Sequence, residues 1–231
     1  VAWQDRRGGQ FDIYTQHFDA NGQPQWETNG QLVCDAVNDQ FEPKLIADAT
    51  GGAVLAWLDY RAGNGFTDVY CQRMLADGTP GFQPNGLPVC VAPNTQWNVQ
   101  LTDDGLGNCL VVWQDRRAGS YDNIFAQKID GSGAPVWTVD GIGVAPVAGA
   151  QYYPQIASDK SGGVVVTWQD NRLGSDYNIY AQHIGENGQS IWSPGGLSVC
   201  SSTGHQYNPQ IISQGNDFII AWQDKRSGNF D

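Results

Sequence analysis

Five acid–base pairs stand at regular intervals along this chain, in the pattern W-x-D-x-R-x-G. A carboxylate in this position can accept hydrogen bonds from turn N–H groups and pair with the Arg two residues later. Because catalysis needs a unique site and this group recurs, we interpret the motif as structural and expect no catalytic residue in it. Its members are Trp3, Asp5, Arg7, Trp57, Asp59, Arg61, Trp113, Asp115, Arg117, Trp168, Asp170, Arg172, Trp222, Asp224 and Arg226.

The same loop also contains a second oxygen ligand. It is Asp12 or Asp68 in the first two copies and Asn123 or Asn178 in later ones. Carboxylate and amide oxygens are ligands that Ca²⁺ accepts. The motif Arg already supplies a positive charge there, however, and the spacing of an EF-hand is absent. We therefore expect no cofactor and no metal site, with Ca²⁺ as the alternative.

A second constellation pairs a Gln with an aromatic residue at the start of the first β-forming run of each repeat. These side chains would ring the mouth of a central channel, where aromatic faces and amides suit a sugar or peptide ligand. The structural alternative is that the aromatic packs between units and the Gln holds a turn. The candidate ligand-binding residues are Gln40, Phe41, Gln96, Trp97, Gln151, Tyr152, Gln206 and Tyr207.

Composition and charge exclude several classes of protein. With 24 acidic and 12 basic residues the formal net charge is −12, which disfavours nucleic-acid phosphates as partners. No apolar run approaches the ~18 residues of a membrane span, so we expect no membrane insertion. Five Cys without a CxxC pattern predict neither a zinc site nor a disulfide framework. Three of them, Cys34, Cys90 and Cys200, fall at one repeat position where another copy has Ala145, which predicts a small buried side chain.

The elements that position these groups follow from the repeat itself. The motif Trp recurs at intervals of 54, 56, 55 and 54 residues. Each unit holds four β-forming runs, such as "YPQIASD", "GGVVVTWQD", "NIYAQHI" and "QSIWSPGGLSVC", separated by hairpin-type turns. Four antiparallel strands per ~55 residues predict an all-β fold, a β-propeller of about four blades.

The predicted organisation is a single β-propeller domain over residues 1–231, or an excerpt of a longer array. Three complete blades span residues 41–96, 97–151 and 152–206. Partial blades span residues 1–40 and 207–231. The end strands could pair with a neighbouring chain, so self-association is expected as one alternative.

At W-Q-D-x-R-x-G-x-x-D/N-I-Y the chain resembles the TolB-like, WxDxR-type propeller repeats of secreted and cell-surface prokaryotic proteins. The resemblance covers essentially the whole chain. It implies a propeller fold, a secreted or cell-surface location, and binding as the general role.

The leading expectation is a non-catalytic extracellular module, not an enzyme, that binds or scaffolds a glycan or protein ligand at the channel mouth. One alternative is a propeller-type glycan hydrolase or lyase, which would need carboxylates about 5 to 10 Å apart. Glu42, Lys44, Asp103 and Asp104 depart from the repeat and could be recruited for it. A third alternative is a structural element of a surface protein or filament.

Overall fold

The computed structural model describes residues 1–174 and 176–229, and these residues contain β-strands and no helix. The strands form five antiparallel sheets, which we call blades I to V. Blade I is β1 (Ala2–Asp5), β2 (Asp12–Thr15) and β3 (Gln31–Cys34); blade II is β4 (Gln40–Ala47), β5 (Ala53–Asp59), β6 (Asp68–Met74) and β7 (Leu87–Cys90); blade III is β8 (Gln96–Asp103), β9 (Cys109–Asp115), β10 (Asn123–Ile129) and β11 (Ile142–Gly143); blade IV is β12 (Gln151–Ser158), β13 (Val164–Asp170), β14 (Asn178–Ile184) and β15 (Leu197–Cys200); blade V is β16 (Gln206–Gln214) and β17 (Asp217–Asp224).

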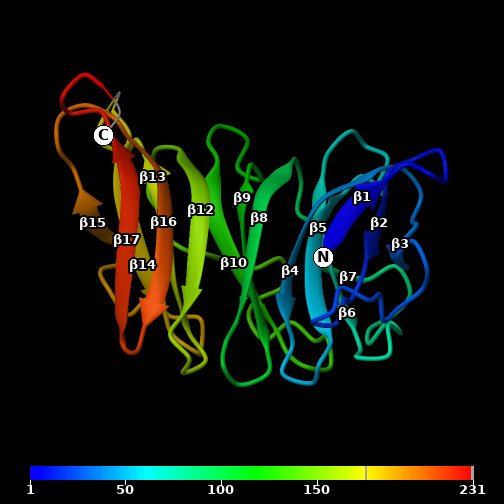
Figure 1. Ribbon diagram of the computed structural model, residues 1–231. Helices are drawn as coiled ribbons and strands as arrows, with labels where there is room; N and C mark the ends of the chain where they lie inside the picture. The colour runs from blue at the N-terminus through cyan, green and yellow to red at the C-terminus, as the bar shows by residue number, and fades with distance from the viewer. Residues whose placement is uncertain (175, 230–231) are drawn as a thin grey trace.

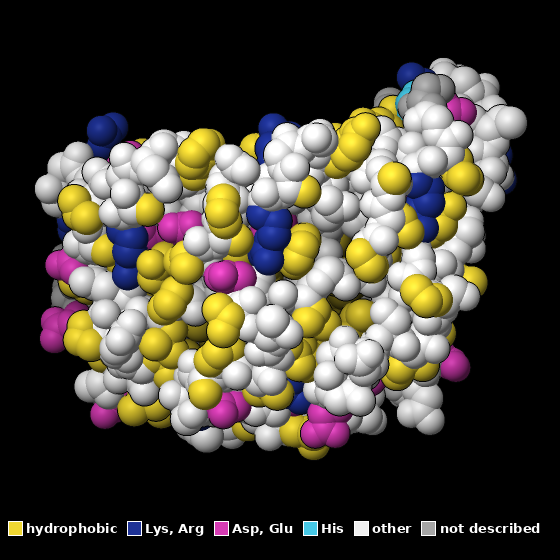
Figure 2. All heavy atoms as spheres, turned by 180° about the vertical axis from the view of Figure 1, so that it is seen from behind, with side chains coloured by type: hydrophobic (Ala, Val, Ile, Leu, Met, Phe, Trp, Pro, Cys, Tyr) yellow, Lys and Arg dark blue, Asp and Glu magenta, His cyan; other side chains and the backbone are white. Residues whose placement is uncertain are grey.

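The blades stand side by side in one row, with the first strands β4, β8, β12 and β16 next to one another (Figure 1). Blade I and blade V lie at opposite ends of this row, and so do the two chain termini. Figure 2 shows the far side of the row, where acidic and basic side chains stand interspersed among hydrophobic ones. The predicted all-β propeller of three complete and two partial blades is confirmed.

The second strand of each complete blade forms the core. All seven residues of β5, β9 and β13 are buried, as expected for β-branched and apolar strands covered on both faces. Trp57, Trp113 and Trp168, each two residues before the end of its strand, are fully buried. Because each strand packs against neighbouring blades, the hydrophobic clusters span the interfaces between blades.

Each first strand carries a β-bulge near its start. The register of β4 with β5 shifts between Phe41 and Lys44, and β8, β12 and β16 shift at the equivalent place. One non-glycine residue in each bulge has a φ of about +50°, and it redirects its side chain out of the alternation of the strand. These bulge residues are Glu42, Asn98, Tyr153 and Asn208.

The five cysteines are all buried and unpaired. Because the described residues form only strands, turns and loops, none of them belongs to an apolar helix long enough to cross a membrane.

Candidate functional site

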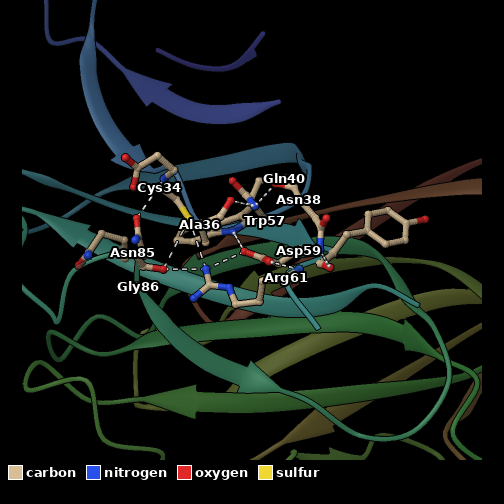
Figure 3. Close-up of polar contacts among 12 residues, drawn as sticks. Cys34, Ala36, Asn38, Gln40, Trp57, Asp59, Arg61, Asn85 and Gly86 are labelled. Atoms are coloured by element: carbon tan, nitrogen blue, oxygen red, sulfur yellow. Dashed lines mark hydrogen bonds and ion pairs between the residues drawn. The ribbon is translucent and has the colours of Figure 1, made fainter. Parts of the chain in front are cut away.

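The W-x-D-x-R motif forms a hydrogen-bonded node between blades (Figure 3). Trp57 Nε1 donates to Asp59 Oδ2 at 2.8 Å, and the backbone N–H of Arg61 donates to Asp59 Oδ1 at 2.8 Å. The Arg61 guanidinium donates to Asp59 at 2.7 Å, to the carbonyl of Asn85 at 2.8 Å and to the Cys34 sulfur at 3.3 Å. Since Cys34 belongs to blade I, the node fastens blade I to blade II.

The node recurs with small changes at the other interfaces. Arg117 donates to Cys90 at 3.2 Å and Arg226 donates to Cys200 at 3.4 Å. Burial raises the pKa of the Cys34 and Cys90 thiols to about 12, so both stay protonated at neutral pH. At the node of Asp170 and Arg172, Ala145 replaces the Cys and offers no sulfur. Gln151 Nε2 donates to Asp170 there, at 3.2 Å. The acid and the base of each node are therefore occupied by one another and by neighbouring chain segments.

The oxygen-rich loops do not assemble a metal-binding cluster. Across residues 1–174 and 176–229, no group of three or more His, Cys, Asp or Glu side chains is placed to hold a metal ion. Asp12 instead accepts a hydrogen bond from Gln10 Nε2 at 3.1 Å. The Ca²⁺ alternative stays a prediction.

One of these loop carboxyls, Asp68, predicts a pH-dependent stability. Burial, together with the charges of Asp59 and Asp140, raises the pKa of Asp68 from 3.8 to about 6. The folded state thus keeps this proton to a higher pH than the unfolded chain, so the Asp68 contribution to stability falls as pH rises from about 4 to about 6. Asp68→Asn should remove this decline and raise the free energy of unfolding at pH 7 by about 2–3 kcal/mol.

Urea unfolding of both proteins at pH 7 and pH 4 checks this expectation. Asn123 and Asn178 occupy the same repeat position, so the amide fits there. At pH 4 the two proteins should converge, because Asp68 is then protonated. A gain that is equal at both pH values would mean that the carboxyl is not the cause.

The four candidate glutamines are fully buried. Gln40 Nε2 donates to the carbonyls of Ala36 and Asn38, at 3.0 and 2.7 Å. Gln96 and Gln206 hold their own turns in the same way. With no exposed surface, these side chains position the turn in front of the first strand and do not reach a ligand.

The four candidate aromatics have different surroundings. Phe41 packs against Phe11 and Tyr60. Trp97 lies under the Arg116 guanidinium, 4.8 Å from its ring centroid. Of the four, only Tyr152 and Tyr207 line the same hollow.

This hollow lies between blades IV and V, and we call it the tyrosine hollow. It has a volume of about 590 Å³. The rings of Tyr152 and Tyr207 each pack against Tyr177, with centroids 5.8 and 5.7 Å apart. Its lining residues are Tyr152, Tyr153, Gln169, Tyr177, Tyr207, Asn208 and Gln223.

Five lining residues of the tyrosine hollow were not predicted. Tyr153 and Asn208 are bulge residues, and Gln169 and Gln223 are the x of W-x-D-x-R. Gln169 Oε1 accepts the backbone N–H of Asn208 at 2.8 Å, and Asn208 Nδ2 donates to Gln223 at 3.0 Å. The Gln169 amide of the second strand in blade IV thus bonds the bulge of blade V. The sequence signal that could have indicated this contact is the Gln that recurs in "WQD".

The four residues that the hydrolase alternative could recruit are not gathered into one site. Glu42 is exposed at the bulge of β4, and Lys44 follows within the same strand. Asp103 ends β8, five residues beyond the bulge and so about 16 Å away along an extended strand, where it pairs with Lys160 at 2.8 Å. Asp104 is buried and pairs with Lys128 at 2.8 Å. Glu42 lies near the start of β4, whereas Asp103 and Asp104 lie at the end of β8, on the opposite side of the blades. Glu42 therefore does not form a carboxylate pair with either Asp.

Comparison with known proteins gives structural neighbours and no sequence family. No protein-family model and no curated protein matches the chain. The alpha-L-arabinanase of Penicillium chrysogenum complexed with arabinobiose matches 94% of this chain and 70% of its own, with 14% identity and a TM-score of 0.55. A thermostable family-43 glycoside hydrolase matches 93% of this chain and 76% of its own, with 13% identity and a TM-score of 0.53.

A third neighbour, a protein of unknown function from Dyadobacter fermentans, matches 96% of this chain and 66% of its own, with 11% identity and a TM-score of 0.50. At these identities the likeness establishes the β-propeller fold, which is the part of the TolB-like resemblance that is confirmed.

The same neighbours correct two functional expectations. We expected a non-catalytic binding or scaffolding module and no enzyme, because the blades are equivalent and the motif residues repeat. Two of the three neighbours are glycoside hydrolases. Repetition of the blade therefore does not argue against catalysis, because an enzyme needs only a few residues that differ between blades.

Proposed function

We propose that this chain is a glycan-hydrolysing propeller whose sugar-contacting surface is the tyrosine hollow. The observation that carries this proposal is the hollow itself, where four Tyr rings and three amide side chains converge. Aromatic faces stack on the apolar face of a sugar ring while amides hydrogen-bond its hydroxyl groups. Two neighbours of the same fold, one of them holding arabinobiose, support a glycan as substrate.

Glu42 is the residue we propose as one of the two carboxylates that glycoside hydrolysis needs. It stands at the bulge position that Tyr153 and Asn208 occupy in the blades of the hollow, and it is the only carboxylate among the four bulge residues. Its backbone N–H is fixed by Gln4 Oε1 at 2.9 Å. Glu42 lies in blade II and the hollow lies between blades IV and V, and packed sheets stand about 10 Å apart. A glycan that reaches from the hollow to Glu42 must therefore be a polymer and not a disaccharide.

The proposal extends to location. The W-x-D-x-R repeat resembles TolB-like repeats of secreted and cell-surface proteins. We therefore propose a secreted or cell-surface protein.

Arabinan is the first substrate to test, with binding measured by calorimetry and hydrolysis by release of reducing ends. Tyr177→Ala removes the ring that joins the other two and should weaken binding about tenfold, the loss of one stacking contact. Tyr121→Ala is the matched control, because Tyr121 is an exposed tyrosine outside the hollow and should bind as the unmodified chain does.

The hydrolysis readout uses Glu42→Gln, which keeps the shape of the side chain and removes its acid–base function. It should lower the rate of reducing-end release by about 10² or more and leave binding unchanged, whereas Glu27→Gln should change neither. Binding without any release would overturn the hydrolase, and release that survives Glu42→Gln would overturn the role of Glu42.

A further inference from the structure

An aromatic side chain closes the interfaces between blades at the end opposite the bulges. Trp26 of blade I donates its Nε1–H to the carbonyl of Ala76 in blade II at 3.0 Å. Trp137 of blade III donates in the same way to Glu186 of blade IV, also at 3.0 Å. Both indoles lie flat against a turn glycine, Gly78 or Gly188. The indole thus fills the interface and satisfies a turn carbonyl.

The interface between blades II and III departs from this arrangement. Phe82 takes the place of the Trp and rests on Gly133, but it has no N–H to donate. The equivalent carbonyl, that of Gly131, instead accepts from the Arg73 guanidinium at 3.1 Å. A cavity of about 270 Å³ remains beside Phe82.

The floor of this cavity is apolar, formed by Ile46, Val54, Phe82 and Cys109. Among its wall residues, Arg73 is engaged with Asp48 at 2.8 Å, so these two charges neutralise each other. Asp103, also in the wall, is likewise neutralised by Lys160.

Asp130 is the wall residue whose charge is not neutralised. Its Oδ1 accepts the backbone N–H groups of Ser132 and Ala134, at 2.8 and 2.9 Å, and the Ser132 hydroxyl at 2.6 Å. Among the residues that the structure describes, no basic side chain pairs with it. The cavity therefore combines an apolar floor with one carboxylate at its wall that is held by turn hydrogen bonds and paired with no basic side chain of the described residues.

We propose that this cavity is a binding site for a small aromatic amine, its ring on the floor beside Phe82 and its ammonium group on Asp130. The volume exceeds the roughly 150 Å³ of an apolar cavity that holds benzene, which leaves room for a ring with a short amino substituent. The site lies at the far end of the blades from the bulges and is separate from the proposed glycan surface.

Three probes of similar size test the site on the full chain by titration calorimetry and NMR. Benzylamine should bind about tenfold or more tightly than toluene, as a charged hydrogen bond provides, and benzoate should bind more weakly than toluene. Equal binding of benzylamine and benzoate, or no binding of either, would overturn the proposal.

Two variants locate the effect. Asp130→Asn keeps an acceptor for the turn N–H groups and should abolish the preference for benzylamine over toluene. Asp77→Asn is its control, since Asp77 accepts from Thr79 in a similar turn outside the cavity and the net charge changes equally. Phe82→Trp should narrow the cavity, weaken both probes and raise the melting temperature. Binding that is indifferent to Asp130→Asn and Phe82→Trp would place the probe elsewhere and contradict the inference.

Discussion

Replacing Asp115 by Asn should lower the free energy of unfolding by about 3 kcal/mol, near the low end for breaking a buried ion pair. The Asp115 side chain is fully buried. It accepts from Trp113 Nε1 at 2.7 Å, from the Arg117 backbone at 2.8 Å and from the Arg117 guanidinium at 2.9 and 2.6 Å. An amide would present N–H groups to these donors and leave the guanidinium without its charge partner.

Asp5→Asn is the matched control for this expectation. Asp5 makes the same contacts with Trp3 and Arg7, but its pair stands at the end of the row, with the Asp and Arg side chains 22% and 39% exposed. Because water screens an exposed pair, this substitution should cost much less. The Asp115 variant should melt roughly 6–12 °C lower, measured by thermal and urea unfolding. Equal losses in the two variants would show that burial of the node does not determine its strength.

The repeat alone was enough to predict the blades and the pairing of the motif Asp with its Arg and with a turn N–H group, but not the hydrogen bond from the Trp or the contacts of the Arg with the neighbouring blade. An Asp two residues from both a Trp and an Arg can bond both side chains, so this local part of the node follows from the spacing, whereas the bonds from Arg61 to Cys34 and Asn85 depend on the packing of the blades. The exchange of Cys34, Cys90 and Cys200 with Ala145 likewise predicted a small buried side chain, because only a small group fits beside the Arg of the next blade.

The candidate glycan surface was only partly predictable, because the bulge breaks the alternation of the first strand. Simple alternation places the Gln and its aromatic neighbour on opposite faces and puts the following residue on the same face as the buried Gln. The bulge turns that residue, Tyr153 or Asn208, into the tyrosine hollow. Pro154 and Pro209 were an overlooked signal, since a Pro cannot donate to the ladder and within a strand often marks a bulge.

The cavity beside Phe82 could be anticipated in one respect only. Phe82 stands out among Trp26, Trp137 and Trp192 when the units are aligned. That the missing indole leaves a cavity, however, depends on how Arg73 redirects toward Gly131. The interface between blades III and IV is arranged differently, because there Lys128 is buried between Asp104 and the carbonyl of Gly162. Such differences arise from packing between blades, which the spacing within one unit does not record.

Gly86→Ala should be about as damaging as the loss of Asp115, for a steric reason. Gly86 has a φ of +80°, and a Cβ there would lie 2.5 Å from the Trp57 ring and 2.6 Å from the Cys71 carbonyl. Trp57 is fully buried and cannot move aside, so overpacking of about 1–3 kcal/mol adds to about 1–2 kcal/mol for a left-handed Ala. Gly119→Ala separates the cost of overpacking from the cost of the left-handed conformation. Gly119 has a φ of +82°, but nothing lies within 4 Å of its would-be Cβ. Urea unfolding should show a loss of only about 1–2 kcal/mol for Gly119→Ala and a clearly larger one for Gly86→Ala. If the two losses are the same, the contact of Gly86 with the motif Trp is not what requires glycine at this turn.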